Sequence, residues 1–586
     1  MKNLPSPIIY EIDYNSNAIK NIENSVTDKK AKYILDYPTV YIVNDKNKRQ
    51  CFSVYIGETT NIKRRSFEHL KNDPDTREDW EKFAQSSTAK MFVIGHDHFN
   101  KSLTLDIENK LMQYMSSVGT VDFVYNRRYN QQNQYYTSSE LDEIFSKIWR
   151  NLHAKNKELF PVESVIKDSA IFKASPFNKL TQEQLDAKDR ILMRIEESLS
   201  QEKTGQLIVV EGEAGSGKTV LMSSLFYELQ QLSKTNENIL LDDISCHLLV
   251  NHDQQLKIYQ QIATKLGIFD SKKSDIVSKP THFINTHTSE EKIDVAIVDE
   301  AHLLLTQGKQ AYRGKNQLND ILERAKVVVA VFDRNQILTT EQYWESDELL
   351  PILHNANLEK NLINLKNQLR INASERTIKW IRSLVDENVV TNIPEDTFGY
   401  ELKVFSSVET MYEEIKVKAQ NEDSGISRML ATFDWPYVDK RKPEGEDYWR
   451  VKVGKWSLPW NLQLKPIGKT RAHKQLSWAE QEQTINEVGS TFTIQGFDLN
   501  YAAVIIGPSV KYRNGKIVFD REASHNKKAT QRRTLKQGKE YLADTLLKNE
   551  LNVLLTRGVN GLYLYAVDPQ LQEVLLQAQK GELPHE

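Results

Sequence analysis

Apolar residues along this chain form short runs, separated by stretches in which apolar positions recur at helical spacing. A run that is short, rich in β-branched residues and bounded by turn signals is typical of a buried strand. Helical stretches follow several of these runs, and this alternation predicts a chain of the α/β class. The strand-like runs occupy residues 39–43, 51–57, 206–210, 293–298, 327–332 and 503–508, and the helical patterns occupy residues 61–70, 103–115, 137–159 and 220–225.

Length and composition describe a chain of several domains without a membrane segment. With 586 residues it is long enough for roughly three or four compact units. Hydrophobic residues make up 39% and charged residues 27%, and no apolar run approaches the roughly 20 residues that a membrane span requires. Residues 1–10 lack a basic segment followed by an apolar core, so we expect no secretory signal.

Cysteine content and charge narrow the expected partners. Cys51 and Cys246 are too few for a disulfide framework or a zinc knuckle, and they favour a reducing cytoplasm. Any metal ion is therefore expected to have oxygen ligands. Because the formal net charge is −3, binding of nucleic acid would depend on local basic patches.

A glycine-rich turn follows the strand-like run at residues 206–210 and precedes a helical pattern. Its sequence, GEAGSGKT at residues 212–219, has the spacing of a phosphate-binding P-loop. Glycines let backbone N–H groups surround the β- and γ-phosphates of a nucleotide at the N-terminus of a helix. Lys218 adds a positive charge, and the Thr219 hydroxyl can reach Mg²⁺. We therefore predict an ATP site whose loop glycines are Gly212, Gly215 and Gly217.

Two further strand-like runs end in polar residues that suit nucleotide hydrolysis. The run at residues 293–298 is followed by Asp299 and Glu300, in the sequence DEAH. Asp299 is predicted to hold Mg²⁺ through water, and Glu300 to polarise the attacking water molecule. The run at residues 327–332 is followed by Gln336, whose amide could sense whether the γ-phosphate is present. Together with the P-loop, the DEAH sequence predicts a Walker B motif.

Residues from about 180 to 570 resemble the Schlafen-like group of superfamily 1 P-loop helicases. The resemblance rests on the P-loop and the Walker B motif, taken in order with three later stretches. It implies a core of two RecA-like domains that binds and hydrolyses ATP with Mg²⁺ and acts on nucleic acid. The later stretches are TFDWP at residues 432–436, STFTIQGFDLNY at 490–501 with the strand-like run after it, and LLTRG at 554–558.

This resemblance implies roles for three further polar residues. Gln184 stands where these helicases have a glutamine that reads adenine by donating and accepting at once, although a surface glutamine at a helix start is the alternative. Arg370 and Arg557 resemble the arginines that the second RecA-like domain supplies across the ATP cleft. Such a guanidinium stabilises charge on the transferred phosphoryl group and couples hydrolysis to domain closure. An ordinary surface ion pair is the alternative for each arginine.

Residues 1–135 begin with two strand-like runs that predict a β-hairpin. In the helical pattern after the hairpin, Arg65 and His69 are four positions apart and share a face. Glu108 lies near the centre of the next helical pattern, and Asn126 follows another strand-like run. Taken singly, each of these residues has an ordinary structural interpretation as a core or surface position.

In order and spacing, however, the polar residues of this segment resemble those of the GIY-YIG endonucleases. The matching positions are Tyr41, Tyr55, Ile56, Gly57, Arg65, His69, Glu108 and Asn126. The resemblance implies a small α+β domain that cleaves phosphodiesters with one divalent cation. Carried over, Tyr41 is the general base, helped by Tyr55 and His69. Glu108 is then the metal ligand, and Arg65 offsets charge in the transition state.

The first motif of this segment reads TVY at residues 39–41, which keeps the tyrosine but not the glycine of that family. A helical connector at residues 136–180 is expected next. Its pattern at residues 137–159 carries an apolar stripe, and Pro161 and Pro176 then interrupt it. We interpret the connector as a hinge or brace whose stripe packs on a neighbouring element rather than on a partner protein.

Basic and aromatic residues near the end of the chain could contact nucleic acid. The structural alternatives are favoured for both sets, a solvated loop for the basic residues and core packing for most of the tryptophans. The basic residues are Lys527, Lys528, Arg532, Arg533, Lys536 and Lys539, and the tryptophans are Trp435, Trp456, Trp460 and Trp478.

Together these patterns predict an ATP-dependent nuclease-helicase that acts on DNA in the cytoplasm, with bacterial antiviral defence as the expected setting. A nuclease-helicase of DNA repair is one alternative, and an ATPase switch gated by nucleic acid with an inert nuclease-like head is another. Cofactors are ATP and Mg²⁺, or another divalent cation at the nuclease site. The expected domains are a GIY-YIG nuclease at 1–135, the connector at 136–180, a first RecA-like domain at 181–340 and a second, with insertions, at 341–586.

Overall fold

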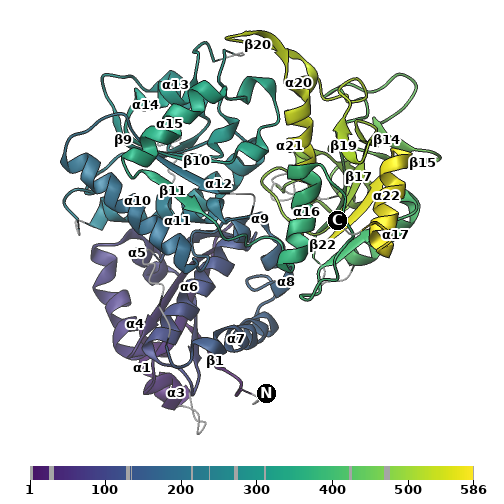
Figure 1. Cartoon of the computed structure of the whole chain (residues 1–586). Coiled ribbons are helices and arrows are strands. Elements are labelled where there is room, and N and C mark those ends of the chain that lie inside the picture. Colours follow the sequence, from purple (N-terminus) through teal and green to yellow (C-terminus); the bar gives the residue numbers. More distant parts are fainter. Residues whose placement is uncertain are drawn as a thin grey trace. The chain divides into compact units, whose positions relative to one another are not determined.

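The computed structural model describes residues 4–25, 32–126, 132, 135–212, 215–235, 238–268, 275–308, 312–420, 425–467 and 476–584 (Figure 1). The chain divides into two compact units. The first unit comprises residues 1–180, 223–231 and 258–274, and the second comprises residues 181–222, 232–257 and 275–586. Within the described ranges, no helix is long and apolar enough to cross a membrane.

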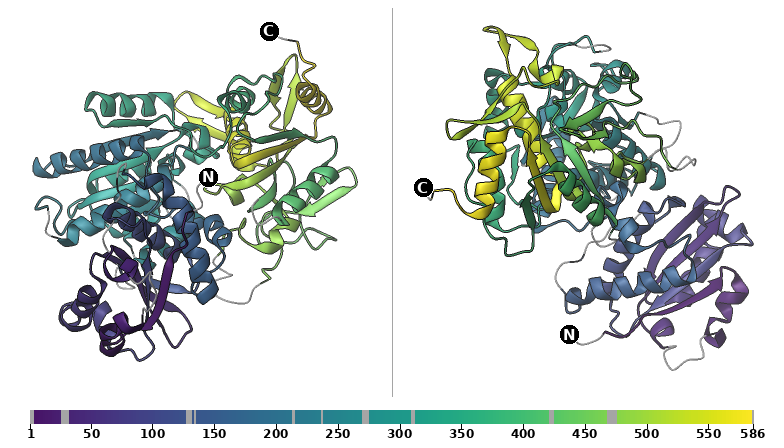
Figure 2. Two further views of the ribbon diagram at one scale, coloured as in Figure 1. Left: turned by 90° about the horizontal axis from the view of Figure 1, so that it is seen from below. Right: turned by 90° about the vertical axis from the view of Figure 1, so that its right-hand side faces the viewer.

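A mixed sheet of five described strands is the centre of the first unit, drawn in purple in Figure 2. Its strands lie in the order β1 (Ile8–Asp13), β4 (Lys90–Gly95), β2 (Thr39–Lys46), β3 (Phe52–Thr59) and β5 (Val121–Val124). The first four strands are joined by antiparallel ladders, and β5 is parallel to β3. The predicted hairpin is therefore present, and its register places Tyr41 directly opposite Gly57.

Helices of the first unit place polar residues in the core. The helix α4 (Ile62–Lys71) begins at Asn61, whose side chain accepts a hydrogen bond from a backbone N–H of the first turn. The helix α6 (Lys101–Ser117) is buried along most of its length, so Glu108 occupies a core position. The other helices of this region are α1 (Ser16–Lys20), α2 (Ile22–Ser25), α3 (Lys32–Leu35), α5 (Glu78–Gln85), α8 (Glu163–Asp168) and α9 (Ala170–Lys173).

The connector predicted at residues 136–180 lies within the first unit. Its main helix, α7 (Leu141–Lys155), buries the predicted apolar stripe. Rings of Phe145 and Trp149 lie 4.6 and 4.8 Å from the ring of Tyr114 on α6. The stripe thus packs on a neighbouring helix of the same unit, as the sequence indicates.

A parallel sheet of six described strands organises the first part of the second unit. Its order is β11 (Leu362–Leu365), β6 (Gln206–Gly212), β10 (Ala325–Phe332), β9 (Ile293–Asp299), β7 (Cys246–Val250) and β8 (Val277–Ser278). All of these ladders are parallel. Strands of a parallel sheet are buried on both faces, which explains the continuous apolar runs of the sequence.

Helices α13, α14 and α15 cover one face of this sheet, where Phe283, Leu318 and Leu353 pack on its strands (Figure 1). The helices of this part are α10 (Gln182–Ser200), α11 (Lys218–Thr235), α12 (Asp253–Lys265), α13 (Pro280–Thr286), α14 (Gln317–Leu322) and α15 (Ser346–Leu358). Residues 223–231 of α11 and 258–265 of α12 are assigned to the first unit. The predicted boundary at residue 340 is wrong, because α15 and β11 come after it. They complete the first parallel sheet rather than begin the second.

A second parallel sheet of five described strands follows in the same unit. Its order is β12 (Glu401–Val404), β22 (Gly558–Ala566), β17 (Leu499–Ile506), β13 (Ser427–Ala431) and β16 (Val488–Gly489), again with parallel ladders. Its helices are α16 (Glu375–Arg382), α17 (Val408–Gln420), α19 (Thr491–Ile494), α20 (Lys527–Thr530), α21 (Ala543–Leu555) and α22 (Pro569–Lys580). Three hairpins are added: β14 (Arg450–Val453) with β15 (Trp456–Pro459), β18 (Val510–Arg513) with β19 (Lys516–Phe519), and β20 (Arg532–Leu535) with β21 (Gly538–Tyr541).

Several of the tryptophans and one arginine of the basic run are buried. Trp435, Trp460 and Trp478 are buried, which favours core packing over base stacking. Within the basic run, Arg533 is also buried and donates to the backbone carbonyl of Tyr343 (2.6 Å) and to the hydroxyl of Thr306 (2.9 Å). Its interpretation as part of a solvated basic loop is therefore wrong, because the guanidinium is used within the fold.

Candidate functional site

The glycine-rich loop joins β6 to the N-terminus of α11, as the strand, loop and helix pattern predicts. Residues 213 and 214 of the motif lie outside the described residues. Gly215 and Gly217 have φ values of +92° and +75°, which side chains rarely adopt. A Cβ atom at Gly217 would also lie 2.1 Å from Nε2 of Gln184. Glycine is therefore required here both by backbone conformation and by the close approach of a neighbour.

Lys218 stands at the first position of α11, with its side chain buried. Its Nζ donates to the carbonyl oxygen of Gly212 (2.6 Å) and lies 3.2 Å from Oδ2 of Asp333. Burial alone would raise the pKa of Asp333, but the Lys218 ammonium holds that pKa below its usual value. The ammonium thus lies beside the loop and next to a carboxylate, where it can also form an ion pair with a bound phosphate.

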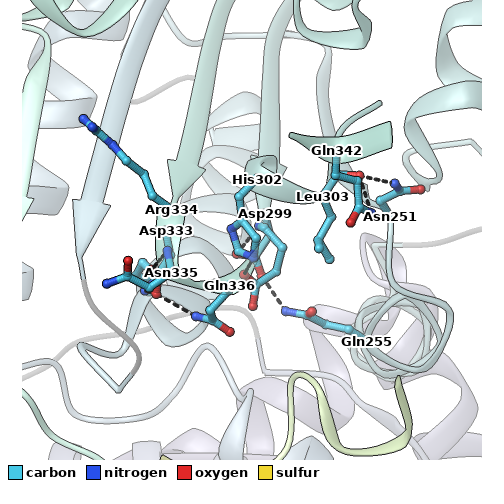
Figure 3. Close-up of polar contacts among 12 residues, drawn as sticks. Asn251, Gln255, Asp299, His302, Leu303, Asp333, Arg334, Asn335, Gln336 and Gln342 are labelled. Atoms are coloured by element: carbon cyan, nitrogen blue, oxygen red, sulfur yellow. Dashed lines mark hydrogen bonds and ion pairs between the residues drawn. The ribbon is translucent and has the colours of Figure 1, made fainter. Parts of the chain in front are cut away.

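Asp299 is the last residue of β9, and Glu300 follows it in a left-handed conformation with φ of +54°. Such a conformation is costly for a residue with a side chain and is concentrated at functional sites. Asp299 accepts a hydrogen bond from Nε2 of Gln255 (2.7 Å), visible in Figure 3. His302 Nε2 lies 3.2 Å from Oε2 of Glu300, and both side chains are buried.

The neighbouring strand β10 brings Gln336 to the same edge of the sheet. Its Nε2 donates to Oδ2 of Asp333 (2.7 Å), as Figure 3 shows. Its Oε1 accepts from Nη2 of Arg557 (3.2 Å), which comes from the residue preceding β22 of the second parallel sheet. Gln336 therefore connects a carboxylate beside Lys218 with an arginine from the other sheet.

Arg557 is fully buried, and burial together with the positive charge of Arg370 lowers its pKa to about 9. Its remaining donors reach the carbonyl oxygens of Val553 (2.9 Å) and Phe497 (3.3 Å). The surface ion pair considered for this arginine is thus excluded. Arg557 forms no ion pair with a carboxylate of the described residues, and a buried guanidinium of this kind suits the binding of an anion.

Arg370 lies beside the P-loop, close behind β11 in the sequence. The backbone N–H of Leu369 donates to the carbonyl of Gly215 (2.8 Å), and Nε of Arg370 lies 2.5 Å from Oδ1 of Asp498. Nη1 of Arg370 is buried without a hydrogen-bond partner among the described residues. The backbone next to Arg370 is therefore tied to the P-loop that follows β6 of the first parallel sheet, although Arg370 was expected on the second RecA-like domain.

Gln184 is buried at the start of α10, so it is not the surface glutamine that was the alternative in the sequence. Its Oε1 accepts from the backbone N–H of Thr181 (2.9 Å), which completes a capping box at the start of α10. Its Nε2 lies 3.3 Å from the carbonyl oxygen of Gly217. A buried helix cap is thus also a neighbour of the phosphate loop, and contact with adenine remains a prediction.

Taken together, the carboxyl ends of β6, β9 and β10 carry a loop for phosphate, two acidic residues and an amide. Ligands of open parallel sheets bind at this edge. In the described part of the chain, Oε1 of Gln255 is buried without a hydrogen-bond partner, and Oε2 of Glu300 forms no hydrogen bond beyond its 3.2 Å approach to Nε2 of His302, so acceptors are available for water or a hydrated cation. The sequence did not single out Asp333, Gln255 or Asp498, because only the fold brings them to this edge.

In the first unit, Tyr41 and Tyr55 lie on the adjacent strands β2 and β3 with ring centroids 6.1 Å apart and an interplanar angle of 23°. A Cβ atom at Gly57 would lie 2.4 Å from the hydroxyl oxygen of Tyr41. Gly57 is therefore required by the close approach of the Tyr41 ring. The two tyrosines face one another, as the resemblance implies.

His69 links Tyr41 to a carboxylate that the sequence did not indicate. Its Nε2 lies 2.8 Å from the Tyr41 hydroxyl oxygen, and its Nδ1 contacts Oδ2 of Asp73. The ring is stacked on Trp80, with centroids 3.7 Å apart. Burial lowers the pKa of His69 to about 4, although Asp73 acts in the opposite direction. A neutral ring with its proton on Nδ1 can accept a proton at Nε2.

Arg65 lies on the same helix as His69 and is partly exposed. Its Nη1 lies 3.1 Å from Oε2 of Glu68. Burial raises the pKa of Tyr41 well above its usual value, and the positive charge of Arg65 opposes this effect. Arg65 is therefore near enough to stabilise negative charge beside the tyrosine.

Glu108 faces Asn126 and a second carboxylate inside the unit. Nδ2 of Asn126 donates to Oε1 of Glu108 (2.7 Å) and to the carbonyl of Ile56 (2.6 Å). Burial and the negative charge of Glu58 raise the pKa of Glu108 to about 8. Oε2 of Glu58 is buried without a hydrogen-bond partner among the described residues, although Lys101 forms an ion pair with Oε1. A buried carboxylate beside a half-buried one with a spare acceptor atom fits a divalent cation.

The fold and the phosphate-loop edge define the class of the second unit as a P-loop nucleotide-binding protein. Residues 205–568 match the family model described as Schlafen group 3, DNA/RNA helicase domain, and the chain belongs to this family. The family implies a helicase-like ATPase region that binds nucleic acid and ATP, with Mg²⁺.

The chain is also similar to a protein from yeast. The Saccharomyces cerevisiae (strain ATCC 204508 / S288c) protein named Uncharacterized protein YPL245W is 32% identical over 469 residues, which covers 74% of this chain and 98% of that protein. The likeness therefore extends over nearly the whole length of the relative.

Proposed function

We propose that the chain is an ATP-dependent nuclease-helicase: an ATPase of the Schlafen group 3 family that acts on DNA, joined to a GIY-YIG head that cleaves phosphodiesters. The observation that carries the proposal is the convergence of Lys218, Glu300 and Arg557 at the carboxyl edge of the first parallel sheet. A second cluster, Tyr41 with His69 and Glu108 in the first unit, supports the cleavage step.

For ATP hydrolysis, Lys218 binds the phosphates, and Thr219 and Asp299 would hold the accompanying Mg²⁺. The ion supplies charge neutralisation on the phosphate oxygens when bound. Glu300 orients the attacking water and accepts its proton. Gln336 reports the γ-phosphate to Arg557, because its amide already contacts that guanidinium. Arg557 and Arg370 stabilise the charge that develops on the transferred group.

For cleavage, His69 rather than Tyr41 is the group that can accept a proton at neutral pH, because its ring is neutral and the Tyr41 hydroxyl is still protonated. The pKa of Tyr41 is raised by burial, so its hydroxyl remains protonated until it can pass its proton to Nε2 of His69. Asp73 fixes the Nδ1 proton of His69 and so keeps Nε2 as the acceptor. Tyr41 then takes a proton from the attacking water as it gives its own to His69.

Glu108 would hold the divalent cation of the head, with Glu58 as the neighbouring carboxylate. Such an ion supplies stabilisation of charge at the scissile phosphate when bound. Asn126 keeps Glu108 oriented through its 2.7 Å hydrogen bond. Arg65 offsets negative charge in the transition state. We propose antiviral defence as the cellular setting, because a nuclease joined to a motor suits the destruction of invading DNA.

The proposal is tested by measuring ATP hydrolysis and strand cleavage in one reaction. The full chain is incubated with a tailed DNA duplex labelled at both ends, Mg²⁺ and ATP. The wild type should hydrolyse ATP in response to DNA and cleave the duplex. Lys218→Ala should lose hydrolysis, and His69→Ala should lose cleavage while keeping hydrolysis. A wild-type protein without DNA-stimulated hydrolysis would reject the motor, and cleavage retained by His69→Ala would reject the proposed head.

A further inference from the structure

Two histidines and an aspartate lie close together in the second unit, away from the carboxyl edge of the first parallel sheet. His247 lies on β7, Asp275 precedes β8, and His287 directly follows α13. In the parallel register, His247 pairs with Ala296 of β9, three positions before Asp299. At about 3.3 Å per residue, the cluster is roughly 10 Å along the sheet from the catalytic edge. It is therefore a separate site.

The donor atoms of this cluster are close to one another. One ring nitrogen of each histidine and one carboxylate oxygen of Asp275 all lie within 4.8 Å of one another. His287 Nε2 is 3.7 Å from Oδ2 of Asp275, and the two imidazole rings are 4.9 Å apart at an angle of 84°. Ligands of a tetrahedral Zn²⁺ ion are about 3.3 Å apart, given metal to ligand distances of about 2.0 Å. Small side-chain rotations would bring the three donor atoms to this spacing.

Hydrogen bonds of the two rings favour the tautomer that leaves Nε2 free. Nδ1 of His247 lies 3.3 Å from the carbonyl oxygen of Asp275, and Nδ1 of His287 lies 3.1 Å from that of Phe283. A carbonyl oxygen only accepts, so these contacts favour a proton on each Nδ1. The Thr286 hydroxyl also lies 3.1 Å from Nδ1 of His287, but it donates to the carbonyl of His282 (2.9 Å). Each Nε2 then keeps its lone pair. Imidazoles that bind metals commonly have their other nitrogen held in this way.

The backbone around the cluster is held in place by independent contacts. Arg324 Nε donates to the carbonyl oxygens of His287 (3.0 Å) and Ile284 (3.1 Å). The ring of Phe283 is stacked on that of His287, with centroids 4.4 Å apart. On the other side, the backbone N–H of Leu248 donates to the carbonyl of Ile276 (2.8 Å), next to Asp275. The ligand-bearing segments are thus positioned before any ion binds.

We propose that His247, Asp275 and His287 bind one Zn²⁺ ion, with a remaining position open to water. Two imidazoles with one carboxylate suit a borderline transition ion better than Mg²⁺, which prefers oxygen ligands. The three ligands belong to β7, to the segment before β8 and to the end of α13. The ion therefore fastens the edge strand β8 and α13 to the sheet of the ATPase.

Zinc binding is measured on the full chain after removal of metals by a chelator. Zn²⁺ is titrated in competition with a chromophoric chelator, with excess Mg²⁺ present to occupy sites made of oxygen ligands. Wild-type protein should bind one tight equivalent. Loss of a ligand in His287→Ala or Asp275→Asn should weaken this binding at least about 100-fold, since even indirect partners of such sites contribute 10- to 100-fold. His282→Ala is the matched control, because His282 is exposed on the same helix.

Two further readouts keep the result unambiguous. Melting temperatures without zinc show whether each variant is folded. If His287→Ala does not fold, the zinc affinity of Asp275→Asn is compared with that of the wild type. Zn²⁺ should raise the melting temperature of the wild type and of His282→Ala but not of the ligand variants. Absence of a tight equivalent in the wild type overturns the proposal. Equal Zn²⁺ affinity in the wild type and in the folded ligand variants overturns it as well.

Discussion

Replacement of Gly57 by alanine tests the geometry of the proposed cleavage site. The added Cβ would lie 2.4 Å from the Tyr41 hydroxyl oxygen and 2.5 Å from Cζ. Ordinary contacts begin near 3.4 Å, so the Tyr41 ring must retreat by about 1 Å. The ring is buried and its hydroxyl is 2.8 Å from His69 Nε2, so such a shift breaks that hydrogen bond.

The size of the effect follows from this displacement. A misplacement of about 1 Å at reacting groups costs on the order of 10²-fold in rate. Overpacking of a filled core costs about 1–3 kcal/mol in the free energy of unfolding. Gly57→Ala should therefore lower cleavage about 100-fold, destabilise the first unit measurably, and leave DNA-stimulated ATP hydrolysis close to that of the wild type.

The assay is nicking of a supercoiled plasmid, with a thermal melt and ATP hydrolysis measured on the same preparation. Gly119→Ala is the matched control, because a Cβ at Gly119 meets nothing within 4 Å. This control should behave as the wild type in all three measurements. Cleavage by Gly57→Ala at the wild-type rate would refute the assignment of Tyr41 and His69 as the proton-transfer pair.

Three further predictions concern charged groups. Lys218→Ala should abolish DNA-stimulated ATP hydrolysis and raise the pKa of Asp333, because the ammonium 3.2 Å away is removed; full hydrolysis in this variant would contradict the P-loop assignment. Arg65→Ala should lower cleavage at least about 10²-fold with a much smaller loss of DNA affinity, as separate cleavage and binding assays can show. Because the raised pKa of Glu108 is about 8, a cation must displace the carboxyl proton below that pH. The affinity for Mn²⁺, measured by half-saturation of cleavage, should therefore rise up to about tenfold per pH unit from pH 6 and level off above pH 8. An affinity that does not change with pH would reject Glu108 as the ligand.

Local motifs allowed much of the ATPase edge to be predicted. The P-loop and Asp299 with Glu300 lie within short stretches whose spacing is fixed by the strand and turn that carry them. Arg557 needed the resemblance to a helicase family, since nothing in its neighbourhood shows that the side chain is buried. Asp333 could not be found, because its role depends on a contact with Lys218 across two strands.

Long-range packing explains what the sequence did not reveal. The boundary at residue 340 was placed too early, since β11 has only four residues and its membership of the first sheet depends on pairing with β6. Asp73 was missed because it lies beyond the end of α4, where only the fold directs it at His69. The expectation that metals have oxygen ligands came from the scarcity of cysteine. It did not weigh histidine ligands, because His247 and His287, the histidines of the proposed zinc site, have no motif spacing.

The central claim is that one chain couples ATP turnover to cleavage of DNA. It is tested most directly by comparing Glu108→Gln with Glu300→Gln on a single tailed duplex, with nicking and ATP hydrolysis followed side by side. Glu291→Gln is the control, because Glu291 is exposed and precedes β9. The Gln replacements preserve side-chain volume, so each removes a group that can ionise with little change in packing.

Glu108→Gln should stop nicking and leave ATP turnover nearly unchanged, because Glu108 serves only the cation of the head. Glu300→Gln should stop turnover and also change the rate or position of nicking, because an ATPase that cannot complete hydrolysis holds DNA in one state. Nicking by Glu300→Gln that equals the wild type in rate and position at every ATP concentration would show that the two activities are independent.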